Sequence, residues 1–130
     1  MSDHPNARRL REGYVAFAKG DFAALDDLFD ENIRWNQPGR SQLAGTYEGR
    51  TAVYEMFGRL MQVTEGSFAT EPMTVLADEE TGVAVCRTTG HRGNVRADIT
   101  DVHVFRFRDG RVTEFTAASA DQYALDELIG

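Results

Sequence analysis

The stretch that decides the fold is DITDVHVFRFRDGRVTEFTAA, residues 98–118, in which two runs of alternating side chains flank the turn Asp109-Gly110. An Asp-Gly pair between alternating runs is typical of a tight β-hairpin. Because side chains alternate between the two faces of a strand, Asp101 and His103 share one face of the first strand with three large apolar residues. Polar groups on a face that points to a core need partners or a ligand, since burying them unpaired costs about 1 to 3 kcal/mol.

Around this hairpin the sequence predicts helices first and strands afterwards, which is an α+β arrangement. Apolar residues at helical spacing predict helices over about 7–19, 21–31 and 51–63, with Gly20 ending the first and Asp21 capping the second. Between the second and third helices we expect a short strand at 33–37 and a loop at 40–46. Alternating residues predict an antiparallel meander of strands over about 67–77, 82–92, 95–107 and 111–118, with Pro72 marking an edge or a bulge. Residues 121–129 are compatible with a short closing helix.

Composition limits the kinds of function. The 130 residues suit a single domain spanning 1–130. A net charge of −7 and a pI of about 4.9 disfavour nucleic acid and anionic membranes, because both bind basic patches. No run approaches the ~20 apolar residues of a membrane span, and the polar start lacks the apolar core of a signal peptide, so we expect a cytoplasmic protein. The single Cys86 rules out an internal disulfide and is expected to be an inert buried thiol.

The sequence also lacks the usual marks of a cofactor site. The three histidines have no metal-ligand spacing with one another. Neither a Gly-rich phosphate loop nor a Gly-x-Ser-x-Gly motif occurs. We therefore expect a site without metal or cofactor.

Three residues are candidates for chemistry. His103 is expected to line a pocket, where it would donate to a ligand carbonyl or move a proton; the alternative is a core histidine satisfied by a neighbour. Its unperturbed pKa of about 6.5 predicts a change in binding or rate through roughly pH 5.5 to 7.5. Asp101 either orients that imidazole or lies at the rim in solvent. Tyr14 faces inward by helical spacing, and either offers its hydroxyl to a ligand or is structural.

Further residues are candidates for ligand binding. Trp35 and Gln37 share a face of the short strand, and Trp35 is either an aromatic pocket wall or plain core. Arg87 belongs to an alternating run whose direction the sequence leaves open. Facing inward it would pair with Asp101 or bind an anionic ligand group, and facing outward it is an ordinary surface arginine. Apolar lining or core is expected from Phe57, Phe105 and Phe115.

Four motifs in order carry a family resemblance: KGDF at 19–22, WNQPG at 35–39, LAGTYEGR at 43–50 and HVFRFRDGR at 103–111. Together they resemble the SnoaL-like branch of the nuclear transport factor 2-like superfamily. The resemblance implies a cone-shaped α+β barrel, in which three helices pack on a curved, mostly antiparallel sheet around an apolar cavity. Relatives include polyketide cyclases, ketosteroid isomerases and limonene epoxide hydrolase beside many members without known activity, so the fold does not decide the function.

The resemblance can be carried over only in part. His103 matches the pocket histidine of the cyclases and the position where ketosteroid isomerases place a protonated carboxylic acid. Gln37 and Ala117 stand where the isomerases and the cyclases, respectively, place a catalytic carboxylate, and a glutamine cannot take the proton. Two functions stay open for a cone that binds a small apolar molecule bearing a carbonyl or hydroxyl. One is a cofactor-free isomerase or cyclase using His103, assisted by Asp101 and Tyr14; the other is a non-catalytic binding or interaction module.

The outer face of the sheet predicts a homodimer. The central strand presents Val102 and Val104 there, between Thr100 and Arg106. The neighbouring strands present either Ala84, Cys86 and Thr88, or Val112, Glu114 and Thr116. Such a small and largely apolar surface is better covered by a second copy than by water, and relatives of the resembled family commonly dimerise through this side.

Overall fold

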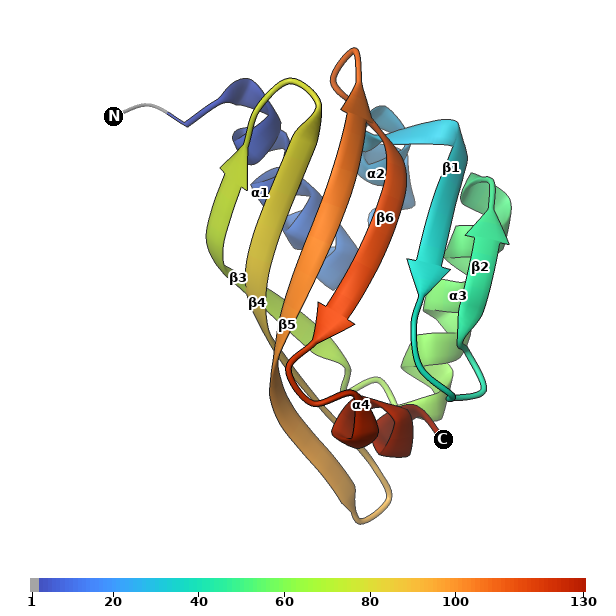
Figure 1. The fold of residues 1–130 in the computed structure, drawn as a ribbon. Helices are drawn as coiled ribbons and strands as arrows, with labels where there is room; N and C mark the ends of the chain where they lie inside the picture. Colours follow the sequence, from blue (N-terminus) through green and yellow to red (C-terminus); the bar gives the residue numbers. More distant parts are fainter. Residues whose placement is uncertain (1–2) are drawn as a thin grey trace.

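The predicted hairpin lies inside a six-stranded sheet of order β2-β1-β6-β5-β4-β3 (Figure 1). The structure, a computed structural model, describes residues 3–130. Its elements in chain order are α1 (Pro5–Lys19), α2 (Phe22–Leu28), β1 (Phe29–Gln37), β2 (Gly45–Glu48), α3 (Arg50–Val63), β3 (Ala69–Ala77), β4 (Thr81–Arg92), β5 (Val95–Arg108), β6 (Arg111–Ser119) and α4 (Gln122–Ile129). The turn between β5 and β6 is confirmed: Asp109 and Gly110 have φ angles of 51° and 78°, the left-handed conformations that a type I′ turn requires.

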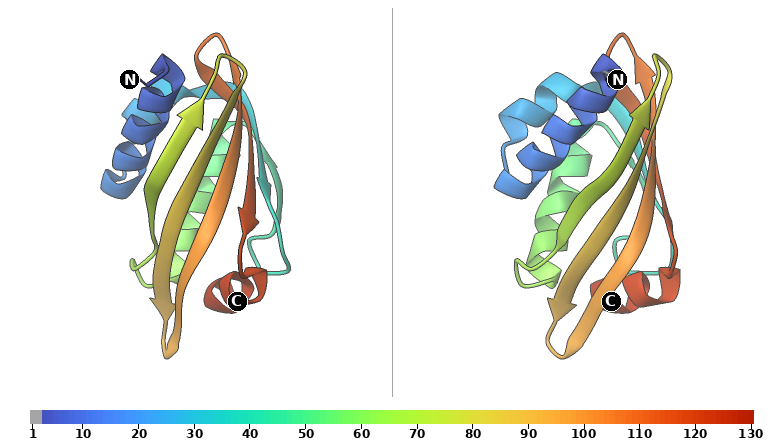
Figure 2. Two further views of the ribbon diagram at one scale, coloured as in Figure 1. Left: turned by 60° about the vertical axis from the view of Figure 1, so that its left-hand side comes forward. Right: turned by 90° about the vertical axis from the view of Figure 1, so that its left-hand side faces the viewer.

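The helices and the sheet form two layers. α1, α2 and α3 cover one face of the curved sheet, α4 lies across its lower end, and the opposite face carries no helix (Figures 1 and 2). The predicted α+β cone is therefore confirmed, as an open mixed sheet whose helices close one side. Within residues 3–130 no helix is long and apolar enough to cross a membrane.

Several predicted details are confirmed, because local chemistry decides them. Gly20 adopts the left-handed conformation (φ 67°) that ends α1, and the Asp21 side chain accepts a hydrogen bond from the Ala24 amide at the start of α2. Strands β3 to β6 form the antiparallel meander. β3 is an edge strand, and its register shifts between Pro72 and Thr74, as expected for a strand that contains proline.

Other predicted boundaries are wrong because distant pairing decides them. α2 ends at Leu28 instead of about residue 31, because Phe29 already pairs with Val112 of β6 as the first residue of β1. β1 runs parallel to β6. The expected loop at 40–46 contains the start of β2, a short strand held only by its antiparallel pairing with β1.

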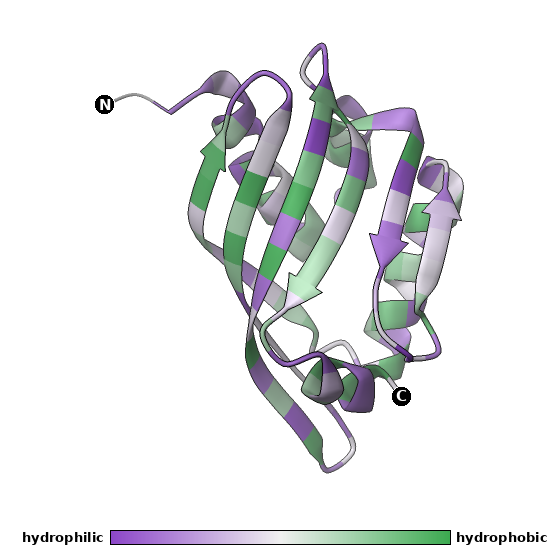
Figure 3. Cartoon of the chain, viewed as in Figure 1, coloured by the Kyte–Doolittle hydropathy of each residue, from purple (hydrophilic) through white to green (hydrophobic). Residues whose placement is uncertain are grey.

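The register of β4 against β5 fixes which side chains enter the core. Ala84 lies opposite His103 and Cys86 lies opposite Asp101, and all four are buried on the helix-covered face. The alternative in which Ala84, Cys86 and Thr88 form the outer surface is therefore wrong. The outer surface of β4 consists of Val83, Val85, Arg87 and Thr89. Hydrophobic residues dominate the halves of β3 and β4 near their shared turn (Figure 3).

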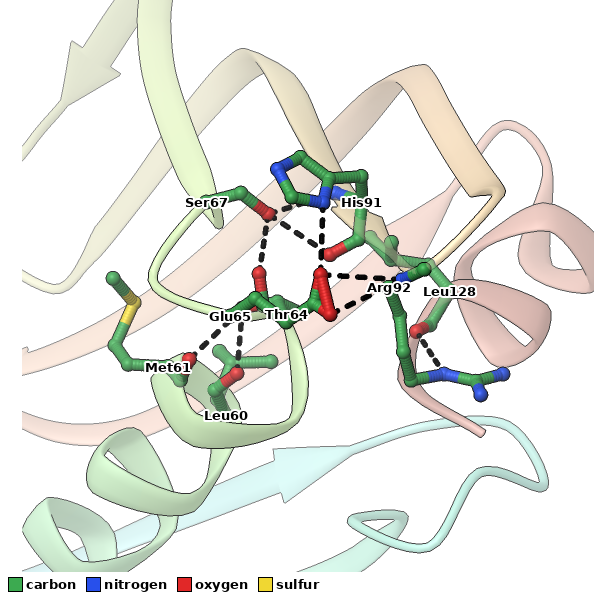
Figure 4. A network of polar contacts seen from close by, with 9 residues as sticks. Leu60, Met61, Thr64, Glu65, Ser67, His91, Arg92 and Leu128 are labelled. Atoms are coloured by element: carbon green, nitrogen blue, oxygen red, sulfur yellow. Dashed lines mark hydrogen bonds and ion pairs between the residues drawn. The ribbon is translucent and has the colours of Figure 1, made fainter.

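A polar network ties the far end of the β4–β5 hairpin to the end of α3 (Figure 4). The Ser67 hydroxyl accepts from the His91 amide (2.7 Å) and donates to the Thr64 carbonyl (2.5 Å). The Glu65 carboxylate accepts from the Gly93 amide (3.2 Å) and lies 3.3 Å from Nδ1 of His91. These bonds hold the long hairpin against the helical layer.

Candidate functional site

An apolar cavity of about 80 Å³ lies between the helices and the sheet. Aromatic rings form much of its wall. Trp35 stacks on Phe115 with ring centroids 3.6 Å apart, and Phe57 meets the indole edge-on at 5.0 Å. Other lining residues include Leu10, Phe17, Leu25, Leu28, Phe29, Met56, Leu60, Phe68, Phe105, Ala117 and Leu125.

A hydrogen bond between a helix and the sheet forms the polar centre of this cavity. The Tyr14 hydroxyl, from α1, lies 2.7 Å from Nδ1 of His103, from β5. The two rings are nearly parallel, at 12°, with centroids 5.9 Å apart. Helical spacing carries Tyr14 inward and strand alternation carries His103 inward, so the two predicted candidates meet across the layers.

Asp101 is the third polar group of the cavity. It lies two residues before His103 on the same face and is only 3% exposed, so the alternative of a solvent-exposed rim position is wrong. Its Oδ2 lies 3.9 Å from Nε2 of His103, which is beyond hydrogen-bond distance. A carboxylate beside Nε2 favours the tautomer with hydrogen on Nε2. Nδ1 then accepts the bond from the Tyr14 hydroxyl.

Burial controls the protonation states of His103 and Tyr14. Desolvation lowers the pKa of His103 to about 4, although the Asp101 carboxylate acts in the opposite direction. Burial, with a smaller contribution from Cys86, raises the pKa of Tyr14 well above its ordinary value. At neutral pH the imidazole is therefore uncharged and the tyrosine keeps its hydrogen. This corrects the expected transition between pH 5.5 and 7.5.

Of the remaining predicted site residues, all but Arg87 lie in the cavity wall. Trp35, Gln37, Phe57, Phe105 and Phe115 all line the cavity. The indole N–H of Trp35 donates to the side-chain oxygen of Gln37 at 3.2 Å.

The prediction that Arg87 contributes to the cavity is wrong. Its side chain is 57% exposed on the outer face and forms a two-pronged ion pair with Asp98, with N–O distances of 2.9 and 2.6 Å. Because the pairing of β4 with β5 turns Cys86 inward beside Asp101, the next residue along the strand must point outward.

Two residues in this region, Cys86 and Thr70, were not predicted to belong to the site. The Cys86 sulfur lies 3.7 Å from Nδ1 of His103, and burial raises the pKa of its thiol. Thr70 of β3 reaches the cavity, and its hydroxyl lies 3.1 Å from that of Thr88. The sequence of β4 carries small or apolar residues on both of its faces, so only the register of β4 against β5 reveals which face points inward. Across residues 3–130, no three metal-ligating side chains of His, Cys, Asp or Glu gather into a metal site.

Comparison with known proteins identifies the family. Residues 9–115 match the family model of the SnoaL-like domain. The solved structure of Bal32a, from a soil-derived mobile gene cassette, is 40% identical over 96% of both chains, with a TM-score of 0.91. A nuclear transport factor 2-like protein of unknown function from Burkholderia pseudomallei is 25% identical over 99% of this chain and 98% of its own (TM-score 0.85), and an uncharacterised protein of Mycobacterium tuberculosis is 27% identical over 129 residues, 98% of each. The resemblance seen in the sequence is therefore confirmed, and the chain belongs to the SnoaL-like family of the nuclear transport factor 2-like superfamily.

Proposed function

We propose that the cavity binds a small, largely apolar molecule carrying a carbonyl or hydroxyl oxygen, and that Nε2 of His103 hydrogen-bonds that oxygen. The observation that carries the proposal is the Tyr14–His103 hydrogen bond at the centre of an apolar cavity. It occupies Nδ1 and leaves Nε2 for a ligand. Few polar groups in an apolar pocket are typical of sites that bind by shape and are oriented by one or two hydrogen bonds.

The size of the cavity limits the ligand to a small molecule. Its volume of about 80 Å³ is between two and three times the ~30 Å³ share of one liquid water, and well below the roughly 300 to 1,000 Å³ of sites for drug-sized molecules. Trp35, Phe57 and Phe115 surround this space with aromatic side chains, which suits an apolar ligand. A molecule with several fused rings would need the helices to move.

The catalytic form of the proposal is a cofactor-free proton transfer next to a carbonyl, as in an isomerase or cyclase. The Nε2–H of His103 would donate to the carbonyl oxygen, and the Asp101 carboxylate, on the same side of the cavity, would accept a proton from the neighbouring carbon. Tyr14 would hold the imidazole in the required tautomer. This form assigns the base to a different position from the relatives, whose carboxylates are replaced here by Gln37 and Ala117.

The second candidate is a binding module without catalysis. The replacement of both carboxylate positions by Gln37 and Ala117 favours it, since no other carboxylate than Asp101 is among the cavity-lining residues that the structure describes. Ligand binding by the same cavity is common to both candidates. They differ only in whether a proton moves.

Two measurements on one ligand separate these candidates. Cyclohexanone is titrated into the protein by calorimetry, and its carbon-bound hydrogens next to the carbonyl are followed by NMR in D₂O. We expect His103→Ala to weaken binding about 5- to 160-fold, the loss of one hydrogen bond of about 1 to 3 kcal/mol. His91→Ala, which removes the same ring from the far end of β4, away from the cavity-lining residues, is the control.

The outcomes are distinct. Deuterium exchange that is faster than in buffer and abolished in His103→Ala and Asp101→Asn supports the catalytic form. Binding without faster exchange supports the binding module. Equal affinity of the wild type and His103→Ala would refute the role of His103 in either form.

A further inference from the structure

Within residues 3–130, one buried side-chain oxygen lacks a hydrogen-bond partner, and it belongs to the Asp101 carboxylate. Across residues 3–130, no donor reaches its Oδ1. Its Oδ2 is 3.9 Å from Nε2 of His103, whereas N–H···O hydrogen bonds span about 2.7 to 3.2 Å. Buried carboxylate oxygens in folded proteins nearly always accept hydrogen bonds, because an unpaired one costs free energy. The carboxylate therefore needs a donor that the described chain does not supply.

We infer that Asp101 and His103 together recognise a hydroxyl group, so that the cavity binds a neutral phenol, enol or alcohol more tightly than a ketone or aldehyde of the same size. The Nε2–H of His103 donates to the hydroxyl oxygen, and the hydroxyl hydrogen is donated to the Asp101 carboxylate. This inference rests on the proposed function and narrows it from carbonyl or hydroxyl to hydroxyl. It makes Asp101 a specificity-determining residue.

The distance between the two groups fits one bridging oxygen. An oxygen can lie about 2.8 Å from both Nε2 and Oδ2, because their separation of 3.9 Å is less than twice a hydrogen-bond length. The terminal torsion of an aspartate is soft and roughly two-fold, so rotation can also turn Oδ1 toward the same hydroxyl. A single ligand atom thus satisfies both cavity groups.

The donor and acceptor roles of the pair are fixed by their neighbours. Because the Asp101 carboxylate lies beside Nε2, the tautomer with its hydrogen on Nε2 is favoured, and Nδ1 is left to accept from the Tyr14 hydroxyl. Asp101, as a carboxylate, only accepts. A hydroxyl both accepts and donates, so it matches the pair, whereas a carbonyl oxygen would place its lone pairs against the carboxylate.

The charge of the cavity selects against anions. No lysine or arginine is found among its lining residues within 3–130, and Arg87 is turned outward to Asp98. A ligand carboxylate would therefore meet Asp101 without a cation to offset the repulsion. A phenol or alcohol, which is neutral at pH 7, avoids this cost.

Three probes of similar size test the inference by calorimetry at pH 7. Phenol donates and accepts, benzaldehyde only accepts, and toluene does neither. We expect the wild-type protein to bind phenol at least ten-fold more tightly than benzaldehyde or toluene, which is the worth of a hydrogen bond to a charged acceptor.

Asp101→Asn reverses part of this preference. The amide of asparagine supplies N–H donors where the carboxylate only accepts. We expect the advantage of phenol over benzaldehyde to fall below three-fold in this variant, with benzaldehyde binding at least as tightly as in the wild type. Asp98→Asn, the same change on the outer face of β5, should keep the wild-type ranking.

Each outcome has a separate meaning. If benzaldehyde or toluene binds the wild type as tightly as phenol, the hydroxyl assignment is overturned, although the cavity remains a binding site. If Asp101→Asn keeps the phenol preference, the role of Asp101 is overturned. If no probe binds the wild type, the proposed function itself fails. The wild-type ranking needs no variant, so the inference is decided even if Asp101→Asn does not fold.

Discussion

At the scale of a single residue, burial changes what His103 can do. The ring is 8% exposed among aromatic side chains, and its pKa falls to about 4. At neutral pH it is a neutral hydrogen-bonding group instead of a cation. The value near 6.5 that applies to an exposed histidine therefore misplaces the titration, although alternation along β5 correctly predicts that the ring faces inward.

The lowered pKa predicts a specific loss of stability in acid. Unfolded chains bind a proton at His103 below about pH 6.5, whereas the folded protein resists protonation until about pH 4. The contribution is therefore complete above pH 6.5 and is lost as the pH falls toward 4. It amounts to roughly 3 kcal/mol over this window.

Urea denaturation between pH 4 and 7 measures this effect. We expect His103→Gln, which cannot titrate, to give a flatter dependence of the unfolding free energy on pH than the wild type. Parallel curves for the wild type and His103→Gln would contradict the buried, neutral state.

The direction of side chains along a strand can be predicted only where the residues on one face are clearly more apolar than those on the other. On β5 the large apolar residues flank His103, so the inward face is evident. On β4 the run VAVCRTT at 83–89 places small or apolar residues on both parities, and only its pairing with β5 sends Cys86 inward and Arg87 outward. That pairing is set by the whole sheet, which is why the position of Arg87 could not be predicted.

At the scale of elements, α4 lies at one end of the cavity. A contact with Arg92 of the β4–β5 hairpin holds the end of this helix (Figure 4). Arg92 at the end of β4 donates from Nε to the Leu128 carbonyl (3.0 Å) and from its terminal nitrogen to the Glu127 carbonyl (2.8 Å). These carbonyls belong to the last turn of α4, where helix carbonyls lack partners. The helix carries Leu125, which lines the cavity.

Removing this contact should loosen the helix. We expect Arg92→Met, which keeps the apolar stem but not the donors, to lower the unfolding free energy by about 1 to 2 kcal/mol. Amide hydrogen exchange should also become faster in α4 than in β5. Arg96→Met, an exposed position on the other arm of the hairpin, is the control, and equal stability of the two variants would show that Arg92 does not anchor the helix.

The elements whose bounds were wrongly predicted are those that depend on strand partners outside their own segment. The boundary between α1 and α2 is correctly predicted, because Gly20 and Asp21 end one helix and begin the next through local hydrogen bonds. The end of α2 depends on Phe29 pairing with β6, more than 80 residues later. β2 is four residues long and exists through its pairing with β1.

At the scale of the whole molecule, the uncovered face of the sheet carries an apolar patch. Val83 lies opposite Val104 and Val85 opposite Val102, and all four point away from the helices. Leu76, 69% exposed at the edge, extends the patch. We propose that a second copy of the chain covers this face, as the most common arrangement for a soluble protein with such a surface.

A charge placed in the centre of this face tests the dimer. We expect the unmodified protein to scatter light as a dimer at micromolar concentration and Val104→Asp to be a monomer, because two buried carboxylates near the two-fold axis would lack partners. Val15→Asp, on the exposed side of α1, should remain a dimer. A monomeric unmodified protein would refute the proposal.

The stacked pair of Trp35 and Phe115 has a practical consequence, because Trp35 is the only tryptophan of the chain. All indole fluorescence therefore originates from one ring, 9% exposed, in the wall of the cavity. We expect this buried ring to emit at shorter wavelengths in the folded protein than in the unfolded chain. A molecule bound against the indole is expected to change the intensity of this emission, so tryptophan fluorescence offers a direct measurement of occupancy of the proposed site.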